Sequence, residues 1–443
     1  MEVIIMISQL ILGLSFLVGV HELGHMLTAK YFGMRVEKFS IGFPPKLFGF
    51  KKGETEYSIG AIPLGGFVKI SGMVDESMDT EAMKAEPQPW EFRSKPAWQR
   101  LIVMLGGVIV NVITAFIIYI ALSWIVGEKY LSIAEVNKYG IVAQDLAKQI
   151  GLQTGDKIIA VNDKKIEDFA SVYEAALDEN ASYTIIRNGE KKHIPIPDTL
   201  LDQLADKNST GFISPPIPFK VGVVKIGSNA DKAGLKKGDS IIAVNGQHTK
   251  YFHLFQEQLK ANKNKTITIT FQRNKEVLSI QAFVDTSGII GFIPELNVQE
   301  SLRTYSFIEA VPHGIYMSVK VVTDQLKAFS KIFKGELKAK NSVGSVITMA
   351  QAYGGTWDWE GFWKLTATLS MILAFMNLLP IPALDGGHVM FLMYEIISGR
   401  KPSDKFLETA QKIGMAILLS LMIFAISNDA IRNSDKIINF FTN

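Results

Sequence analysis

Hydrophobic residues along this chain gather in long windows that contain almost no charge. Four windows reach the length that a helix needs to cross a bilayer, and they cover residues 3–29, 101–126, 362–384 and 413–427. The first window opens with Glu2 instead of a basic segment and lacks a clear small-residue cleavage site, which argues against a signal peptide. The pattern therefore predicts a multi-pass α-helical membrane protein with four transmembrane helices and a long insert between the second and the third.

The insert has a strand-like pattern and contains an internal repeat. GLQTGDKIIAVND at residues 151–163 recurs as GLKKGDSIIAVNG at residues 234–246. Each copy places a Gly-Asp turn before a short apolar strand, and a helix-like stretch and a further strand follow. The shared pattern GLxxGDxIxxVN resembles that of PDZ domains, so we expect PDZ-like α+β domains at residues 128–213 and 218–286. Such domains bind peptides at a sheet edge, often by a C-terminal carboxylate; the alternative is a spacer without a ligand.

An amphipathic segment follows the repeats. Apolar residues at alternating spacings of four and three predict a helix over residues 305–334, within a linking segment that we place at 300–361. This helix either lies on the outer leaflet or packs under the PDZ-like pair, and simple core packing accounts for it equally well. The remaining residues, 1–127 and 362–443, form the expected membrane part.

Composition narrows the classes of partner and metal site. The 443 residues carry a formal net charge of +3, and no basic stripe with interleaved aromatic residues is present, so we expect no nucleic-acid partner. The chain has no cysteine, which leaves His, Asp and Glu as metal ligands. Lys and Arg near the span ends gather in segments 28–100 and 400–412, which are therefore expected in the cytoplasm. Both termini and the insert at 127–361 are then expected outside.

The first apolar window contains three ionisable residues in the stretch His21-Glu22-Leu23-Gly24-His25. Such groups are costly in hydrocarbon and are usually functional there. His21 and His25 share one helix face and can bind one Zn²⁺, while Glu22 can take a proton from water at the metal. The motif also occurs by chance in soluble helices, but inside an apolar span it indicates a metal site.

A catalytic zinc site usually has three protein ligands and one position left for water. Asp385, in the stretch NLLPIPALDGGH, is the other strongly placed acid in the membrane windows. The two histidines and Asp385 lie about 20 residues into spans that run in the same direction, so we expect them at a similar depth near the cytoplasmic face. His388 lies one helical turn further and is the alternative ligand.

Broken helix structure is expected beside this acid. Pro380 and Pro382 interrupt the helical hydrogen-bond ladder, and unwound backbone at membrane depth requires a cavity lined by protein or water. Residues 377–385 are therefore expected to be extended. Asn377 can hydrogen-bond a substrate backbone, or it can make an ordinary helix–helix hydrogen bond.

A strand-like segment lies between the first two spans, on the side where the metal is expected. Residues 55–72, TEYSIGAIPLGGFVKISG, predict a hairpin with a turn at Gly65-Gly66. A hairpin that dips toward the site offers an edge strand to an extended substrate, which makes these two glycines candidate substrate-binding residues. An ordinary cytoplasmic loop is the alternative.

Together these motifs resemble the site-2 protease family of intramembrane zinc metalloproteases, in its bacterial RseP type. The resemblance covers nearly the whole chain and rests on HELGH, FSIGF at 39–43, TEY with PLGGFVK at 55–69, the tandem repeats and NLLPIPALDGGH. It implies a zinc ion held by His21, His25 and Asp385, with Glu22 as general base.

The resemblance also implies how substrates are handled. Asn377 helps to hold the substrate, and residues 55–72 are the membrane-associated β-loop. Family members cleave transmembrane segments, such as those of anti-sigma factors or remnant signal peptides, after a first protease has shed the outer domain. The PDZ pair excludes intact substrates by size. This chain departs from the family at Gly107–Asn111, where the frequent Gly-Pro-x-x-Asn pattern lacks its proline.

Two other functions stay open at this point. A non-catalytic membrane adaptor would use the PDZ pair to bind peptide C-termini and the metal for structure alone, although a purely structural site is usually closed by a fourth protein ligand. A metal transporter would need more polar residues along a path through the spans. The sequence favours an intramembrane zinc endopeptidase in a bacterial inner membrane.

Overall fold

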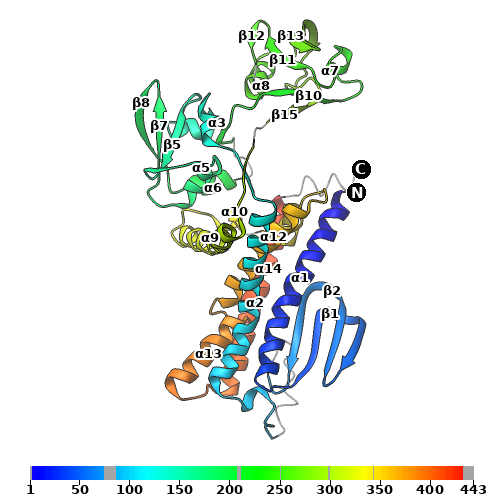
Figure 1. The fold of residues 1–443 in the computed structure, drawn as a ribbon, viewed down its shortest axis with the longest axis vertical. Coiled ribbons are helices and arrows are strands. Elements are labelled where there is room, and N and C mark those ends of the chain that lie inside the picture. The colour runs from blue at the N-terminus through cyan, green and yellow to red at the C-terminus, as the bar shows by residue number, and fades with distance from the viewer. Residues whose placement is uncertain are drawn as a thin grey trace. The chain divides into compact units, whose positions relative to one another are not determined.

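The structure is a computed structural model, and it describes residues 2–73, 86–206, 211–249, 251–297, 300–342 and 344–432. The chain divides into two compact units (Figure 1). We call the first the membrane unit, which comprises Met1–Glu128 and Thr304–Asn443, and the second the insert unit, which comprises Lys129–Arg303. Each hydrophobic cluster lies within one of these units.

Four helices of the membrane unit are long and apolar enough to cross a bilayer, judged on the described residues. They are α1 (Glu2–Tyr31), α2 (Ala97–Ile125), α12 (Trp359–Leu378) and α14 (Asp404–Arg432). The prediction of four spans is thereby confirmed. Small residues allow membrane helices to approach closely, and α1 meets α2 where a Cβ added to Gly24 would lie 2.2 Å from the carbonyl oxygen of Gly106.

The fourth span is longer than the predicted window at 413–427 at both ends, and a polar residue near its C-terminal end is fully paired. The Asp429 carboxylate is buried and accepts hydrogen bonds from the backbone amides and hydroxyl groups of Ser345 and Thr348. These donors lie at the start of α11 (Val346–Tyr353). The helix can therefore continue past an acid that the hydrophobic pattern alone treats as its end.

The third span is shorter than the predicted window at 362–384. Helix α12 ends at Leu378, residues 379–384 are not helical, and a new helix, α13 (Asp385–Ser398), begins at Asp385. The prolines at 380 and 382 cannot donate to a helical ladder, which explains the break. The break expected next to Asp385 is confirmed, and it puts this acid at a helix N-terminus. The prediction of an extended stretch over 377–385 is wrong in detail, because the break covers only residues 379–384 and contains a turn at 382–383.

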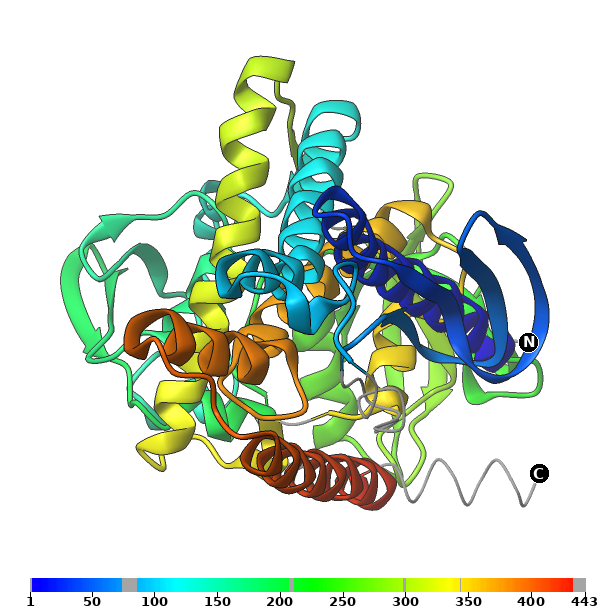
Figure 2. The same cartoon turned by 90° about the horizontal axis from the view of Figure 1, so that it is seen from below.

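A β-hairpin follows α1 and consists of β1 (Val36–Lys52) and β2 (Thr55–Ile70). Both strands are long and bent. Residues 36–41 of β1 pair with residues 66–70 of β2 on one edge, and residues 38–41 also pair with residues 56–59 on the other. The segment 66–70 has no further partner strand among the described residues. Figure 2 shows the hairpin beside α1.

The predicted amphipathic helix is confirmed as α9 (Phe307–Phe333). Ser306 and Glu309 form a capping box at its N-terminus. The helix packs on α2 through small residues, and Gly314 lies against Ile120. Much of its predicted apolar face stays exposed, including Ile315, Val319, Leu326 and Phe333, so packing within the membrane unit does not account for that face. Three short helices complete this unit: η2 (Phe92–Ser94), α10 (Ala339–Ser342) and the α11 already described.

The insert unit contains two lobes of the same construction, which we call the first lobe (residues 131–214) and the second lobe (residues 215–297). Their main sheets have the corresponding strand orders β6-β5-β7-β8 and β12-β11-β13-β14. The first lobe comprises α3 (Ile133–Asn137), β4 (Val142–Ala143), α4 (Asp145–Gln149), β5 (Lys157–Val161), β6 (Lys164–Lys165), α5 (Ala170–Glu174), η3 (Ala175–Leu177), β7 (Ser182–Arg187), β8 (Glu190–Pro195), α6 (Leu200–Ala205) and β9 (Ile213–Ser214). The second lobe comprises β10 (Phe219–Val224), α7 (Asn229–Lys232), β11 (Ser240–Val244), β12 (Gln247–His248), α8 (Phe252–Ala261), β13 (Thr266–Arg273), β14 (Glu276–Phe283) and β15 (Phe292–Leu296).

The sequence repeat is thus a structural repeat. Two strands lie outside the lobes, β3 (Glu128–Tyr130) and β16 (Ser301–Arg303), and they pair with each other. Both lobes combine short helices with a four-stranded sheet, as expected of α+β domains. Their assignment as PDZ domains stays a prediction.

Candidate metal centre

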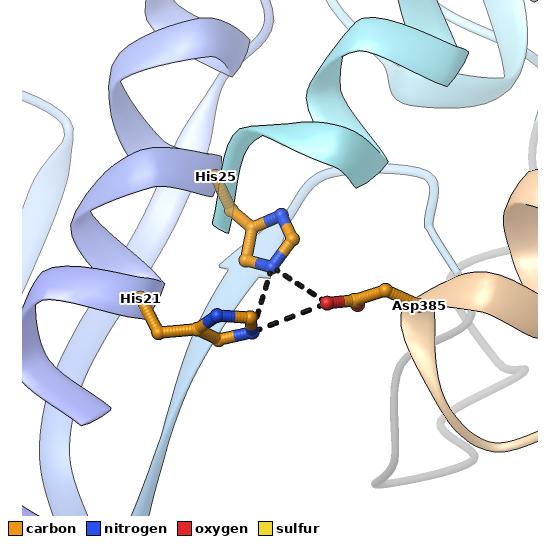
Figure 3. A group of neighbouring side chains, drawn as sticks. All are labelled: His21, His25 and Asp385. Carbon is orange, nitrogen blue, oxygen red and sulfur yellow. Dashed lines mark hydrogen bonds and ion pairs between the residues drawn. The ribbon is translucent and has the colours of Figure 1, made fainter. Parts of the chain in front are cut away.

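Three ligand-type side chains from distant parts of the sequence meet inside the membrane unit (Figure 3). His21 and His25 extend from one face of α1, and Asp385 is the first residue of α13. The Nε2 atoms of His21 and His25 lie 3.3 Å apart, and Asp385 Oδ2 lies 3.1 Å and 3.4 Å from them. Within the described residues this is the only group of its kind, and the alternative ligand His388 is not part of it.

The hydrogen bond of His25 fixes which ring nitrogen is available to a metal ion. His25 Nδ1 lies 2.8 Å from the carbonyl oxygen of Val103, which can only accept, so Nδ1 carries the proton. In the neutral ring, Nε2 then presents a lone pair to the Asp385 carboxylate. Asp385 Oδ2 is itself buried without a hydrogen-bond partner among the described residues. Electron-rich atoms in this position fit a shared metal ion.

The donor types and their spacing suit zinc. Zn²⁺ takes imidazole nitrogen and carboxylate oxygen at about 2.0–2.2 Å, usually in a tetrahedron. Donors in such a tetrahedron lie about 3.4 Å apart, close to the separations found here. The three residues could therefore hold Zn²⁺ and leave one position open.

Helix α2 forms one wall of the cluster, and a glycine makes this possible. A Cβ added to Gly107 would lie 2.5 Å from His25 Nε2 and 2.6 Å from His21 Cε1, closer than real Cβ contacts. No side chain larger than hydrogen fits here while the rings keep their positions. Gly107 is the first residue of the stretch Gly107–Asn111. This stretch lacks the proline of the Gly-Pro-x-x-Asn pattern but has its glycine, which faces the cluster.

Asn377 reaches the same cluster from the last turn of α12. Its Nδ2 atom lies 3.2 Å from His21 Nε2. The polar end of this side chain is therefore next to the candidate metal position, within reach of a group bound there.

Glu22 lies between the cluster and the hairpin. It follows His21 on α1, and the backbone amide of Val68 on β2 hydrogen-bonds its carboxylate. A Cβ added to Gly66 would lie 3.5 Å from Glu22 Cγ. The free edge of β2 thus runs past the acid that is expected to act as the base.

The prediction of a turn at Gly65-Gly66 is wrong, because both glycines lie within the continuous strand β2. They are needed for close approach: a Cβ on Gly65 would lie 2.2 Å from the Phe43 ring, and one on Gly66 would lie 2.6 Å from Val18 Cγ1. Gly66 is close to the cluster, whereas Gly65 faces the hairpin's own phenylalanine.

The sequence reasoning missed the contribution of α2. Asn111 is fully buried, and its Nδ2 atom lies 3.1 Å from His21 Nδ1. Its own carbonyl oxygen accepts a hydrogen bond from Ser370 on α12. An asparagine four residues after Gly107 in an apolar span is a signal that could have identified it, since polar residues within membranes are often functional.

Comparison with known proteins identifies a matching family and several relatives. The model of the peptidase family M50 matches residues 9–421. A Vibrio cholerae protein named as a zinc metalloprotease is 30% identical in a gapped alignment of 455 positions, which covers 95% of this chain and 97% of the relative. Protease RseP of Yersinia pestis is 29% identical over 97% of this chain and 99% of its own length. The regulator of sigma E protease of Haemophilus influenzae is 27% identical, with coverage of 96% and 98%.

Proposed function

The chain belongs to peptidase family M50, the site-2 proteases, and from that premise we propose that it cleaves transmembrane segments of single-span membrane proteins after another protease has shed their outer domains. Membership of this family makes the chain a zinc metalloprotease whose substrates are, in general, membrane proteins. The four apolar helices agree with an integral inner-membrane protein. Anti-sigma factors and remnant signal peptides are the proposed substrates.

The proposed zinc ligands are His21, His25 and Asp385. The observation that carries this assignment is the convergence of three metal-binding atoms within 3.4 Å of one another among membrane helices. Bound zinc would supply Lewis acidity, which acidifies water and polarises a carbonyl group.

Glu22 is the proposed general base. Its carboxylate is adjacent to the cluster and is oriented by the Val68 amide. It takes a proton from the attacking water and returns it to the nitrogen of the departing amine, so the side chain is unchanged after each cleavage.

The substrate must be extended before it is cut. A helical peptide bond is shielded by its own hydrogen bonds, and unwinding it in lipid is costly unless the freed groups find new partners. The free edge of β2 at residues 66–70 can pair with an extended segment by strand addition, next to Glu22. Asn377 can hydrogen-bond the same segment at the metal.

The two lobes of the insert unit would control access from the outer side. The excess of Lys and Arg near the other ends of the spans supports this orientation, with the metal near the cytoplasmic side. As PDZ-like domains, the lobes would bind exposed peptide C-termini.

Cleavage of a defined substrate tests the proposal. A tagged single-span protein without an outer domain is incubated in liposomes with the wild type, with Glu22→Gln and with Glu408→Gln, each with and without a zinc chelator. Glu408 lies on α14 and its side chain is 50% exposed, so it is a control acid outside the site. We expect cutting by the wild type and Glu408→Gln, loss on chelation, and a fall of at least about 100-fold in Glu22→Gln.

Normal cutting by Glu22→Gln would contradict the assignment of the base. If no protein cuts while zinc stays bound, the adaptor function becomes the better explanation.

A further inference from the structure

Helix α2 faces the two histidine rings with three residues spaced one turn apart: Val103, Gly107 and Asn111. Gly107 leaves room for both rings. Val103 and Asn111 each approach the Nδ1 atom of one ring, at 2.8 Å from His25 and 3.1 Å from His21. One helix, α2, thus contacts the Nδ1 atoms of both histidine rings.

The contact to His25 fixes its tautomer, as described above. The carbonyl oxygen of Val103 accepts the Nδ1 proton, and Nε2 is left free to bind a metal. A matched ligand pair requires the same tautomer at His21, with a proton on Nδ1 and an acceptor opposite it.

Asn111 has such an acceptor, and it is unused. The Oδ1 atom is buried without a hydrogen-bond partner among the described residues, while Nδ2 faces His21 Nδ1. A donor in that position would force the ring proton onto Nε2, the atom that faces Asp385. A half-turn of the amide exchanges its oxygen and nitrogen with almost no change in shape.

We propose that Asn111 is a positioning residue for the metal site, whose Oδ1 accepts the Nδ1 proton of His21 and so keeps Nε2 free for zinc. This inference rests on the ligand set of the proposed function. The half-turn adds no unpaired atom, because Nδ2 takes the place of an oxygen that already lacked a partner. Its benefit is that both rings present Nε2 to the same point.

Two substitutions separate this role from a purely structural one. Asn111→Leu keeps the approximate volume but removes the acceptor. Asn111→Asp supplies acceptors only, as in the carboxylate–histidine–zinc arrangement. Ser370→Ala is the matched control, because it removes a buried hydrogen bond to the carbonyl of Asn111 without changing what His21 contacts.

The measurement is zinc affinity, by competition with a chelator after metal removal from the full-length protein in detergent, with the unfolding temperature recorded alongside. We expect Asn111→Leu to bind zinc about 10- to 100-fold more weakly, the range for loss of such outer partners. Asn111→Asp should bind close to the wild-type affinity. Ser370→Ala should bind like the wild type even if its unfolding temperature falls.

Wild-type affinity in Asn111→Leu would overturn the proposal, and so would an equal loss in Asn111→Asp and Asn111→Leu, since that would mean the amide acts as a donor. Should leucine prevent folding, Asn111→Ala makes the same comparison. A wild type that binds no zinc would overturn the ligand set itself, which distinguishes failure of the proposed function from failure of this inference.

Discussion

The buried carboxylates of the two lobes in the insert unit differ from the carboxylate at the candidate metal centre in how their oxygens are paired. In the insert unit, Asp156 and Asp239 are each 1% exposed, and all their oxygens are paired. Arg187 donates two hydrogen bonds of 2.7 Å to Asp156, and Arg273 does the same to Asp239. In the membrane unit, Asp385 Oδ2 has no such donor among the described residues.

This difference separates carboxylates that stabilise the fold from a carboxylate that is available to bind a ligand. A fully paired carboxylate repeated in two lobes contributes to folding, and its Asp-Arg pair also raises the pKa of each arginine. Buried groups that lack partners are rare in proteins and need a specific explanation. Two of the unpaired buried atoms of the membrane unit, Asp385 Oδ2 and Asn111 Oδ1, belong to side chains that contact His21, as expected of a ligand site.

The largest effect is expected when the charge of Asp385 is removed. Asp385→Asn keeps the size of the side chain but removes the anionic ligand, so zinc affinity should fall by more than the roughly 100-fold upper range of outer-partner changes. Zinc content of the purified protein measures this. The equivalent change in the insert unit, Asp239→Asn, should leave zinc content at the wild-type level, and a loss of zinc there would break the distinction.

A second, smaller effect is expected at the wall of the site. Gly107→Ala would insert a methyl group 2.5 Å from His25 Nε2, so the rings must move and zinc affinity should fall by about 10-fold or more. Gly19→Ala on α1 is the control, because its methyl group would meet only the flexible end of Ile41, at 3.1 Å. Equal zinc affinity in both variants would show that α2 does not shape the site.

Much of the fold could be predicted because hydrophobic length and repeats are local signals. The four spans, α9 and the repeated lobes follow from such patterns. The end of α14 could not be predicted, since Asp429 is paired with residues about 80 positions earlier. Pairing between distant residues leaves no periodic pattern in the sequence.

At the candidate metal centre, too, some residues could be predicted from the sequence and others could not. HELGH identified His21 and His25, and equal depth in two parallel spans identified Asp385. Gly65-Gly66 predicts a turn because this dipeptide usually marks one, whereas here the close approach of the Phe43 ring and of Val18 on α1 requires the glycines. The role inferred for Asn111 depends on which ring atom of His21 it faces, and only the folded structure gives that contact.

A third prediction concerns the paired carboxylates themselves. Asp239→Asn leaves Arg273 without its anion, so opening of the second lobe should become easier by about 2 kcal/mol, less than for a fully buried pair because the arginine is partly exposed. Because the chain has no cysteine, Ala230→Cys in the second lobe and Ala147→Cys in the first provide matched buried probes. Thiol labelling should accelerate in the mutated lobe alone.

The smallest effect distinguishes the two lobes from each other by pH. Burial lowers the pKa of His253 in the second lobe, and nearby Glu257 opposes this only in part. Since the folded-state pKa lies below the unfolded value of about 6.5, the unfolded state binds the proton first, and stability present above that pH is lost as pH falls. The labelling rate at Ala230→Cys relative to Ala147→Cys should therefore rise below about pH 6.5. His253→Phe should abolish this rise, whereas the same change at His193, whose side chain is 55% exposed in the first lobe, should not. A ratio that stays constant with pH would mean that protonation of His253 does not favour the unfolded second lobe.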